Sequence, residues 1–146
     1  MYFSKNVRDA MFLANAMYVG TFDKAGYPYI YHCISVAEKQ VSEDETVVAL
    51  LHDIIEDGKV KLSDLTFNEN VKNALVAITR RKGEKYFDYI NRLKTNEIAR
   101  YVKIADLNHN LQNRGYEIPT SLRERYEKAR AILLQENVNE FTKRSN

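Results

Sequence analysis

Cysteine, proline and glycine are scarce in this sequence, and each shortage excludes a class of structure. Cys33 is the only cysteine among 146 residues, so the chain cannot form an internal disulfide, which fits a reducing compartment. Two prolines and five glycines favour regular elements joined by short connections. A formal net charge of +2 is too near balance to indicate a nucleic-acid or membrane partner.

Long apolar runs are also missing. The apolar-rich stretch near the amino terminus covers residues 12–19, which is too short to cross a bilayer and lacks the small-residue cleavage site of a signal peptide. We therefore expect a cytoplasmic protein with no membrane partner. A length of 146 residues favours one domain with its own hydrophobic core, and the polar residues from about 137 onward predict a frayed tail.

Helical periodicity dominates what is present. One apolar stripe recurs at steps of three and four, which predicts an amphipathic helix that ends at Gly20; it consists of Val7, Ala10, Met11, Ala14, Met17 and Tyr18. Comparable stripes predict helices from residue 28, from 42 to about 57, through 71–78, over 86–93, from about 95 to near 115, and from 119 onward. No run alternates as a strand would. The sequence therefore predicts a single all-α domain over residues 1–146, with about six to eight helices.

One of these helices carries its own start and stop signals. Ser42 and Glu45 have the spacing of a capping box, in which each side chain bonds to the backbone of the other. Gly58 is a natural helix end, because glycine readily takes the left-handed conformation that closes a helix. The segment between them contains the most informative residues of the chain.

Four side chains with metal-binding chemistry are spread along the sequence: His32, His52, Asp53 and Asp106. Two imidazole nitrogens and two carboxylates suit a hard-to-borderline divalent metal that keeps positions open for water and a phosphate. Adjacent helix residues point about 100° apart, so His52 and Asp53 can both reach inward only toward a common centre, which a metal would supply. Asp106 borders an apolar stripe, where an unpaired carboxylate would be costly.

Glu56 and Asp57 follow the His-Asp pair by one helical turn. Residues four apart share a face, so Glu56 projects with His52 and Asp57 projects with Asp53. An acid/base pair would be useful there. The competing explanation is a solvated helix end, although carboxylates at that end oppose the helix dipole.

Other polar residues near these have a structural explanation as well as a functional one. Lys103 and Asn110 run along the same helix edge as Asp106 and are equally explained as polar surface residues. His109 follows three residues after Asp106, and we expect it to serve packing rather than an outer contact of the metal. Cys33 is expected to be a small buried packing residue rather than a nucleophile.

Taken together, three segments resemble the HD-domain metal-dependent phosphohydrolases. They read KAGYPYIYH over residues 24–32, ALLHDIIED over 49–57 and VKIADLNHN over 102–110. The family pattern is close to KSGxPYxxH, LLHDxxED and KxxDxxxN, and its order and rough spacing match across residues 14–113. More narrowly, the segments resemble the hydrolase domain of RelA/SpoT-type proteins, including the small single-domain alarmone hydrolases.

The resemblance implies a role for each matching residue. It implies four ligands to one divalent metal, usually manganese: His32, His52, Asp53 and Asp106. It implies a catalytic pair, a lysine near the substrate phosphates and an asparagine near the ribose, which are Glu56 with Asp57, Lys24 and Asn110. The implied reaction removes the 3′-pyrophosphate from guanosine tetra- or pentaphosphate. The partner would be a small-molecule nucleotide, hydrolysis without synthesis is expected at this length, and nothing indicates an oligomer.

Four positions depart from the family pattern, chiefly where the base would be recognised. Asp23 stands where an arginine usually stacks on the guanine, and a carboxylate there would repel a nearby phosphate. Ala25 replaces a serine, Cys33 follows His32 in place of a proline, and Leu107 replaces an arginine. Two alternatives therefore stay open: an HD phosphohydrolase of another nucleotide or dinucleotide phosphate, and a non-catalytic nucleotide sensor. The retained acid/base pair argues against the sensor.

Overall fold

The computed structural model describes residues 1–135, so the tail predicted from about residue 137 lies outside the described part. Within that part the chain forms seven α-helices and one 3-10 helix, and the only strand-like pairing is an isolated bridge between Phe22 and Pro28. The helices are α1 (Lys5–Tyr18), α2 (Ile30–Ala37), α3 (Glu43–Leu51), η1 (Leu62–Asp64), α4 (Glu69–Ile78), α5 (Tyr86–Leu93), α6 (Glu97–Asn110) and α7 (Thr120–Leu134). The prediction of an all-α fold is confirmed.

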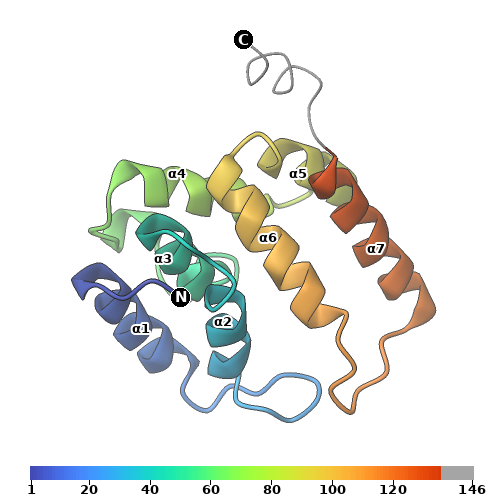
Figure 1. Cartoon of the computed structure of the whole chain (residues 1–146), viewed down its shortest axis with the longest axis horizontal. Coiled ribbons are helices and arrows are strands. Elements are labelled where there is room, and N and C mark those ends of the chain that lie inside the picture. Colours follow the sequence, from blue (N-terminus) through green and yellow to red (C-terminus); the bar gives the residue numbers. More distant parts are fainter. Residues whose placement is uncertain (136–146) are drawn as a thin grey trace.

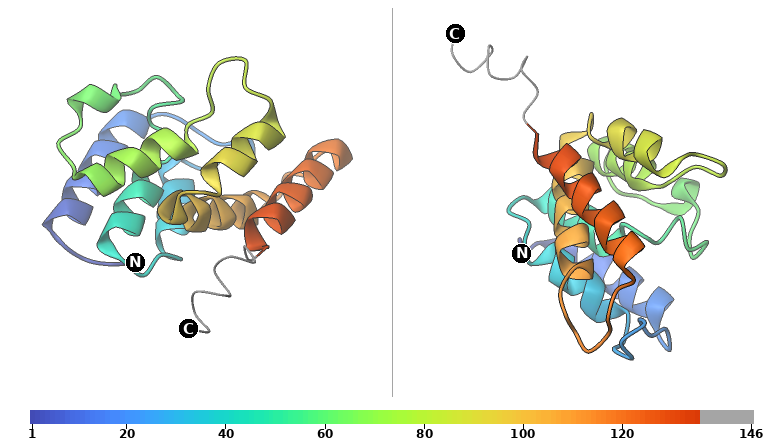
Figure 2. Two further views of the ribbon diagram at one scale, coloured as in Figure 1. Left: turned by 90° about the horizontal axis from the view of Figure 1, so that it is seen from above. Right: turned by 90° about the vertical axis from the view of Figure 1, so that its right-hand side faces the viewer.

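Helix α3 lies at the centre of the arrangement, and its sequence explains why. Every residue from Thr46 to Leu51 is buried, so this helix is enclosed on all sides rather than along one stripe. It packs against α1, α2, α4 and α6 (Figure 1). Helix α7 stands at the edge of the molecule against α5 and α6, and it buries only Ala129 and Leu133 (Figure 2).

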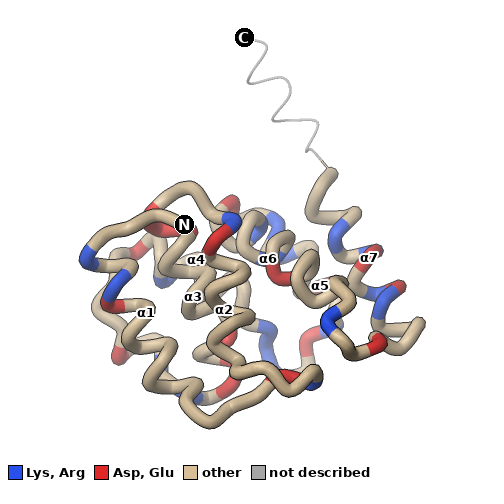
Figure 3. Tube along the Cα trace, turned by 60° about the horizontal axis from the view of Figure 1, so that its bottom comes forward, with Lys and Arg blue, Asp and Glu red and all other residues tan. Residues whose placement is uncertain are grey.

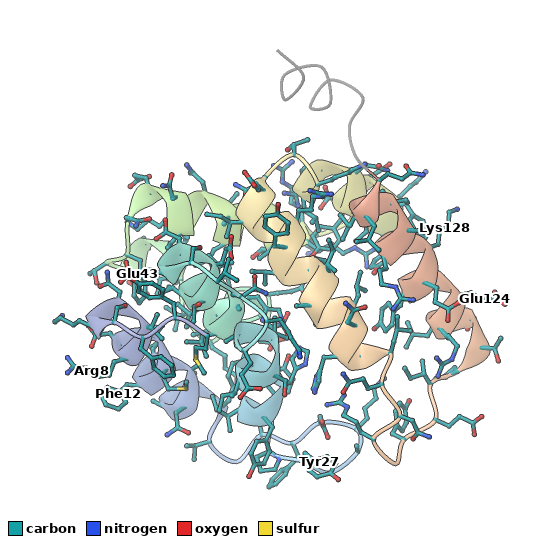
Figure 4. All side chains as sticks on the ribbon, viewed as in Figure 1. Arg8, Phe12, Tyr27, Glu43, Glu124 and Lys128 are labelled. Carbon is teal, nitrogen blue, oxygen red and sulfur yellow. The ribbon has the colours of Figure 1, made fainter. Side chains whose placement is uncertain are left out.

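Charged residues are carried on the outer faces of the peripheral helices. Figure 4 shows Arg8 and Phe12 on the outer side of α1 and Glu124 on the outer side of α7. Acidic and basic positions are interspersed along the trace in Figure 3. In the described part of the chain, no helix combines the length and the apolar character that crossing a membrane requires.

Side-chain caps fix where several helices begin. The Ser42 hydroxyl accepts from the backbone N–H of Glu45, whose side chain accepts from the backbone N–H of Ser42 in return. The predicted capping box is therefore confirmed. Ser4, Asn68 and Asn96 accept equivalent bonds at the starts of α1, α4 and α6. The start of α6 matters for function, because this helix carries residues of the candidate site.

Helix α3 ends at Leu51, earlier than predicted, and residues 52–58 form consecutive turns. The bond from Ile54 N to the Leu51 carbonyl spans three residues rather than the four of an α-helix. The Ala49 carbonyl, which a continuing helix would offer to the backbone, accepts from Nδ1 of His52 at 2.7 Å. A side chain thus takes a bond that would have prolonged the helix, and the tighter turns carry the His-Asp pair toward the interior.

Candidate active site

Three parts of the fold bring the four predicted metal ligands to one point. His32 comes from α2 and Asp106 from α6, while His52 and Asp53 lie in the turns after α3. Nε2 of His32 lies 3.2 Å from Nε2 of His52 and 3.0 Å from Oδ1 of Asp106. Nε2 of His52 lies 3.1 Å from Oδ2 of Asp53 and 3.5 Å from the same Asp106 oxygen. The four ligand atoms therefore form one cluster.

Both histidines turn Nε2 toward this cluster because the other ring nitrogen is engaged elsewhere. Nδ1 of His52 donates to the Ala49 carbonyl at 2.7 Å. Nδ1 of His32 lies 2.7 Å from Nδ1 of His109. A contact of this kind on the far nitrogen is how proteins orient a metal-binding imidazole.

Two carboxylates share the centre, Asp106 buried and Asp53 partly exposed, and their charges determine its electrostatics. Burial opposes ionisation of Asp106, but Nζ of Lys103, at 2.7 Å from Oδ2, and the neighbouring imidazoles hold its pKa well below the usual range. Burial also works against Asp53, yet the His52 imidazole lowers its pKa to about 2. Burial opposes the charge on His52, and the two carboxylates outweigh it and raise its pKa well above normal. Lys103 balances one of the two negative charges, and a protonated His52 balances the other unless a metal cation takes the place of its Nε2 proton.

The donor set fits a divalent metal. Neighbouring ligands around an ion with bonds of about 2.1 Å stand about 3 Å apart, and the neighbouring donor atoms here are separated by 3.0–3.5 Å. His32, His52 and Asp53 offer ligand atoms that all lie within 4.8 Å of one another, and Asp106 adjoins them. The Tyr29 hydroxyl, which the sequence did not single out, donates to Oδ2 of Asp53. Four protein ligands of this kind leave positions free on a six-coordinate ion.

Glu56 and Asp57 stand at the exposed rim of this centre. Oε1 of Glu56 accepts from the backbone N–H of Arg80 at 3.1 Å, and Oδ2 of Asp57 accepts from the Tyr18 hydroxyl at 2.9 Å. The backbone bond from Asp57 N to the Asp53 carbonyl, 2.9 Å long, retains the single helical turn that the sequence predicted between these two residues. Although both side chains reach solvent, desolvation by the surrounding protein raises the pKa of each carboxyl.

A cavity of about 430 Å³ opens beside Asp57 and contains two more of the predicted residues. Lys24, from the loop between α1 and α2, and Asn110, at the end of α6, both line it. Nδ2 of Asn110 also donates to Oδ1 of Asp106 at 3.0 Å, so the cavity adjoins the metal cluster. Its walls carry four tyrosines: Tyr18, Tyr29, Tyr116 and Tyr126. A volume of this size with aromatic walls suits a nucleotide-sized ligand.

Three residues whose roles the sequence left open are clarified by their surroundings. Lys103, equally explained from sequence as a surface charge, is buried against Asp106. The expectation that His109 only packs is wrong, because it makes a polar contact with His32. Its spacing of three from Asp106 was the available signal, since the two share a helix face. Cys33 is buried, and burial raises the pKa of its thiol to about 11, as expected for a packing residue.

Asp23 is fully engaged in organising its loop. Oδ1 accepts the backbone N–H groups of Ala25 and Tyr27, each at 2.9 Å, around a turn that Gly26 completes with a φ of 88°. Oδ2 lies 3.3 Å from Nη1 of Arg114, which comes from the connection between α6 and α7. Arg114 therefore balances the negative charge that the sequence analysis expected to repel a phosphate.

Sequence comparison with known proteins finds relatives of this chain. No family model matches the sequence. A guanosine-3′,5′-bis(diphosphate) 3′-pyrophosphohydrolase of Borreliella burgdorferi is 26% identical over 146 aligned positions, which cover 85% of this chain and 21% of that protein. The bifunctional (p)ppGpp synthase/hydrolase SpoT of Escherichia coli is 25% identical, covering 76% of this chain and 18% of that protein.

The structural comparison agrees on the fold. A solved structure, described as a metazoan ortholog of SpoT that hydrolyzes ppGpp, superposes with a TM-score of 0.74 at 21% identity, and covers 95% of this chain and 91% of that one. The predicted resemblance to SpoT-type HD hydrolases is therefore confirmed, and the fold is that of the metazoan ortholog. The chain spans about a fifth of the length of the curated relatives it matches.

Proposed function

We propose that this chain is a single-domain, metal-dependent phosphohydrolase that removes the 3′-pyrophosphate from guanosine tetra- or pentaphosphate. The observation that carries the proposal is the cluster of His32, His52, Asp53 and Asp106 beside a nucleotide-sized cavity. The printed activities of the sequence relatives support the alarmone as substrate, and Mn²⁺ is the metal that the resemblance favours.

Each residue has a task in this reaction. A divalent ion held by the four ligands would supply a bound water of lowered pKa and polarise a phosphoryl oxygen. Asp57, which lines the cavity, is placed to orient an attacking water and accept its proton. Glu56, whose side chain lies outside this cavity against the Arg80 backbone, is assigned the second proton transfer. Attack forms one P–O bond and breaks the bond to the 3′-oxygen, which takes up a proton as pyrophosphate leaves. Lys24 offsets phosphate charge, and Asn110 contacts the ribose.

The test is release of pyrophosphate and orthophosphate with Mn²⁺ across guanosine alarmones, mononucleotides and dinucleotide phosphates. We expect pyrophosphate from the alarmones, and a loss of roughly 100-fold or more in kcat when Glu56→Gln and Asp57→Asn are combined. The double variant should retain Mn²⁺ binding, because neither residue is a ligand. Glu127→Gln, an exposed position on α7, serves as the matched control.

A second candidate keeps the same chemistry with another nucleotide or dinucleotide phosphate as substrate. The observation that favours it is Asp23, whose carboxylate is bonded within its own loop and offers no flat cation to stack on a guanine. Orthophosphate from another nucleotide, with the alarmones untouched, would select this candidate. Tight nucleotide binding without any turnover by the native chain would instead select the sensor.

A further inference from the structure

Three polar side chains connect the metal cluster to the nucleotide cavity, and the proposed reaction assigns none of them a role. They are His109, Arg114 and Asp23. Nδ1 of His109 lies 2.7 Å from Nδ1 of the candidate ligand His32. Nη1 of Arg114 lies 3.3 Å and 3.2 Å from the two ring nitrogens of His109, and 3.3 Å from Oδ2 of Asp23.

The contact between the two Nδ1 atoms constrains where the proton lies. One ring must donate and the other must accept, since two lone pairs or two protons would repel at this distance. When His32 offers the Nε2 lone pair to a cation, its proton is on Nδ1, so Nδ1 of His109 is the acceptor. For His52 the equivalent acceptor is the Ala49 carbonyl. His109 is buried, which keeps water from replacing it in this contact.

Arg114 contacts the face of the His109 ring rather than its edge. The two nitrogens of an imidazole point away from each other, so a donor that is nearly equidistant from both must lie above the ring plane. From there the guanidinium interacts with the ring face, and the lone pair of Nδ1, which lies in the ring plane, stays available to accept from His32. The Arg114 side chain is 25% exposed, and its buried Nε has no hydrogen-bond partner among residues 1–135, so the main anchors found there are the ring and Asp23.

We propose that His109 is a positioning residue for the metal centre, and that the Arg114–Asp23 pair holds it against His32. The pair joins the loop between α1 and α2 to the connection between α6 and α7, two segments that lie side by side at the bottom of Figure 1. The same loop carries Lys24, so the phosphate-contacting and metal-holding parts of the site are fixed relative to each other. This inference rests on the proposed metal-dependent function.

The first experiment compares Mn²⁺ affinity in His109→Leu and His109→Asn, measured from the electron paramagnetic resonance signal of free Mn²⁺. Leucine cannot accept the His32 proton, and we expect affinity to fall roughly 10–100-fold, as for other contacts that orient metal ligands. The asparagine side-chain oxygen stands close to the position of Nδ1, so His109→Asn should restore most of that loss. A role in packing alone would predict the opposite order, because leucine fills the buried space better.

The second experiment tests the Arg114–Asp23 pair. In Asp23→Asn the side-chain oxygen still accepts the two loop N–H groups, while the ion pair is lost. Arg114→Met and Asp23→Asn should each weaken Mn²⁺ binding by a similar factor, and the double variant should weaken it no further than either, because both remove one interaction. Arg130→Met, which removes an exposed bond to Asn108, is the matched control and should bind as the native chain does.

Two results would be decisive against these ideas, and they are distinguishable. Unchanged affinity in both His109→Leu and Arg114→Met, in a native chain that binds Mn²⁺ and hydrolyses its nucleotide, overturns the positioning role and leaves the function standing. Absence of Mn²⁺ binding and hydrolysis in the native chain overturns the function itself. The Arg114 and Asp23 variants carry the test if leucine at 109 prevents folding, which circular dichroism would reveal.

Discussion

Tyr18, at the last residue of α1, connects that helix to the proposed acid/base pair by donating to Asp57 at 2.9 Å. Desolvation raises the pKa of Asp57, and this hydrogen bond works in the opposite direction because it favours the ionised carboxylate. Tyr18→Phe should therefore raise that pKa further, so the carboxylate becomes available only at higher pH. We expect the acid limb of the kcat/KM profile to move upward, with Tyr2→Phe as the control. An unmoved limb would assign the proton transfer to Glu56.

Lys103 makes a second prediction at the scale of one residue. The Asp106 carboxylate is buried and the Lys103 ammonium is largely shielded from solvent, so Lys103→Met leaves a buried charge with less compensation. We expect a loss of about 3 kcal/mol in the free energy of unfolding without metal. Mn²⁺ should stabilise this variant more than the native chain, because the ion replaces the missing positive charge. Urea unfolding with and without Mn²⁺ measures both, against the exposed-site control Lys39→Met. Equal stabilisation in both proteins would contradict the argument.

Residue types and spacing were enough to predict the members of the cluster, but not the contacts that orient them. His32, His52, Asp53 and Asp106 have donor chemistry that is visible in the sequence, and the structure brings them together. The contact between His32 and His109 depends on how α2 packs on α6, which no local pattern encodes. The charge pair of Asp23 with a residue 91 positions away is equally invisible until the loops are placed.

Arg92 provides the clearest interaction between elements. From α5 its guanidinium donates to the carbonyls of Ala77 and Thr79 at the end of α4, where a cation also suits the helix dipole. It pairs with both oxygens of Glu84, and these bonds to Arg92 lower the pKa of Glu84 to about 2. The pKa of Glu84 is therefore lower in the folded chain than in the unfolded chain. The ion pair stabilises the fold at any pH above the pKa of glutamate in the unfolded chain, and this stabilisation is lost as the pH falls toward 2.

Glu84→Gln tests that dependence. The native chain should melt at a higher temperature than the variant at pH 7, and the difference should shrink as the pH falls below the ordinary glutamate range. The difference in melting temperature shrinks because, in this pH range, Glu84 binds a proton more readily in the unfolded chain than in the folded one. Acid therefore favours unfolding of the native chain, whereas glutamine at this position binds no proton. Melting curves between pH 7 and pH 2.5 measure it, with Glu127→Gln as the control. A difference that stays constant over this range would mean that charge plays no part.

Helix boundaries were predictable where a side chain caps the backbone locally. Ser42 and Glu45 lie three residues apart and form a capping box, so the start of α3 could be predicted from the sequence. Its end is not, because it depends on the His52 ring donating to the Ala49 carbonyl, and that orientation is imposed by the buried cluster. Tertiary contacts therefore end the regular helix at Leu51, while Gly58 still closes the turns that follow with a φ of 68°, and the acid/base pair lies on those turns.

For the molecule as a whole, the four candidate ligands join α2, α6 and the turns after α3; these parts also pack against one another, and His32 contacts His109 between α2 and α6. An ion that binds the folded chain and not the unfolded one stabilises it by about 2.7 kcal/mol at 100 times its dissociation constant, which corresponds to a rise of roughly 5–10 °C in Tm for a chain of this size. We expect this rise with Mn²⁺ and its reversal by a chelator.

Asp106→Asn makes that prediction specific to the cluster. The amide keeps the shape of the side chain but removes the charge that binds the ion, so the rise in Tm with Mn²⁺ should largely disappear. Asp88→Asn, at an exposed position on α5, should keep the full rise. Because surface carboxylates also bind Mn²⁺ weakly, an equal rise in both variants would locate the stabilising ion away from the four candidate ligands. A rise lost only in Asp106→Asn would mean that one buried ion fastens three parts of the fold together.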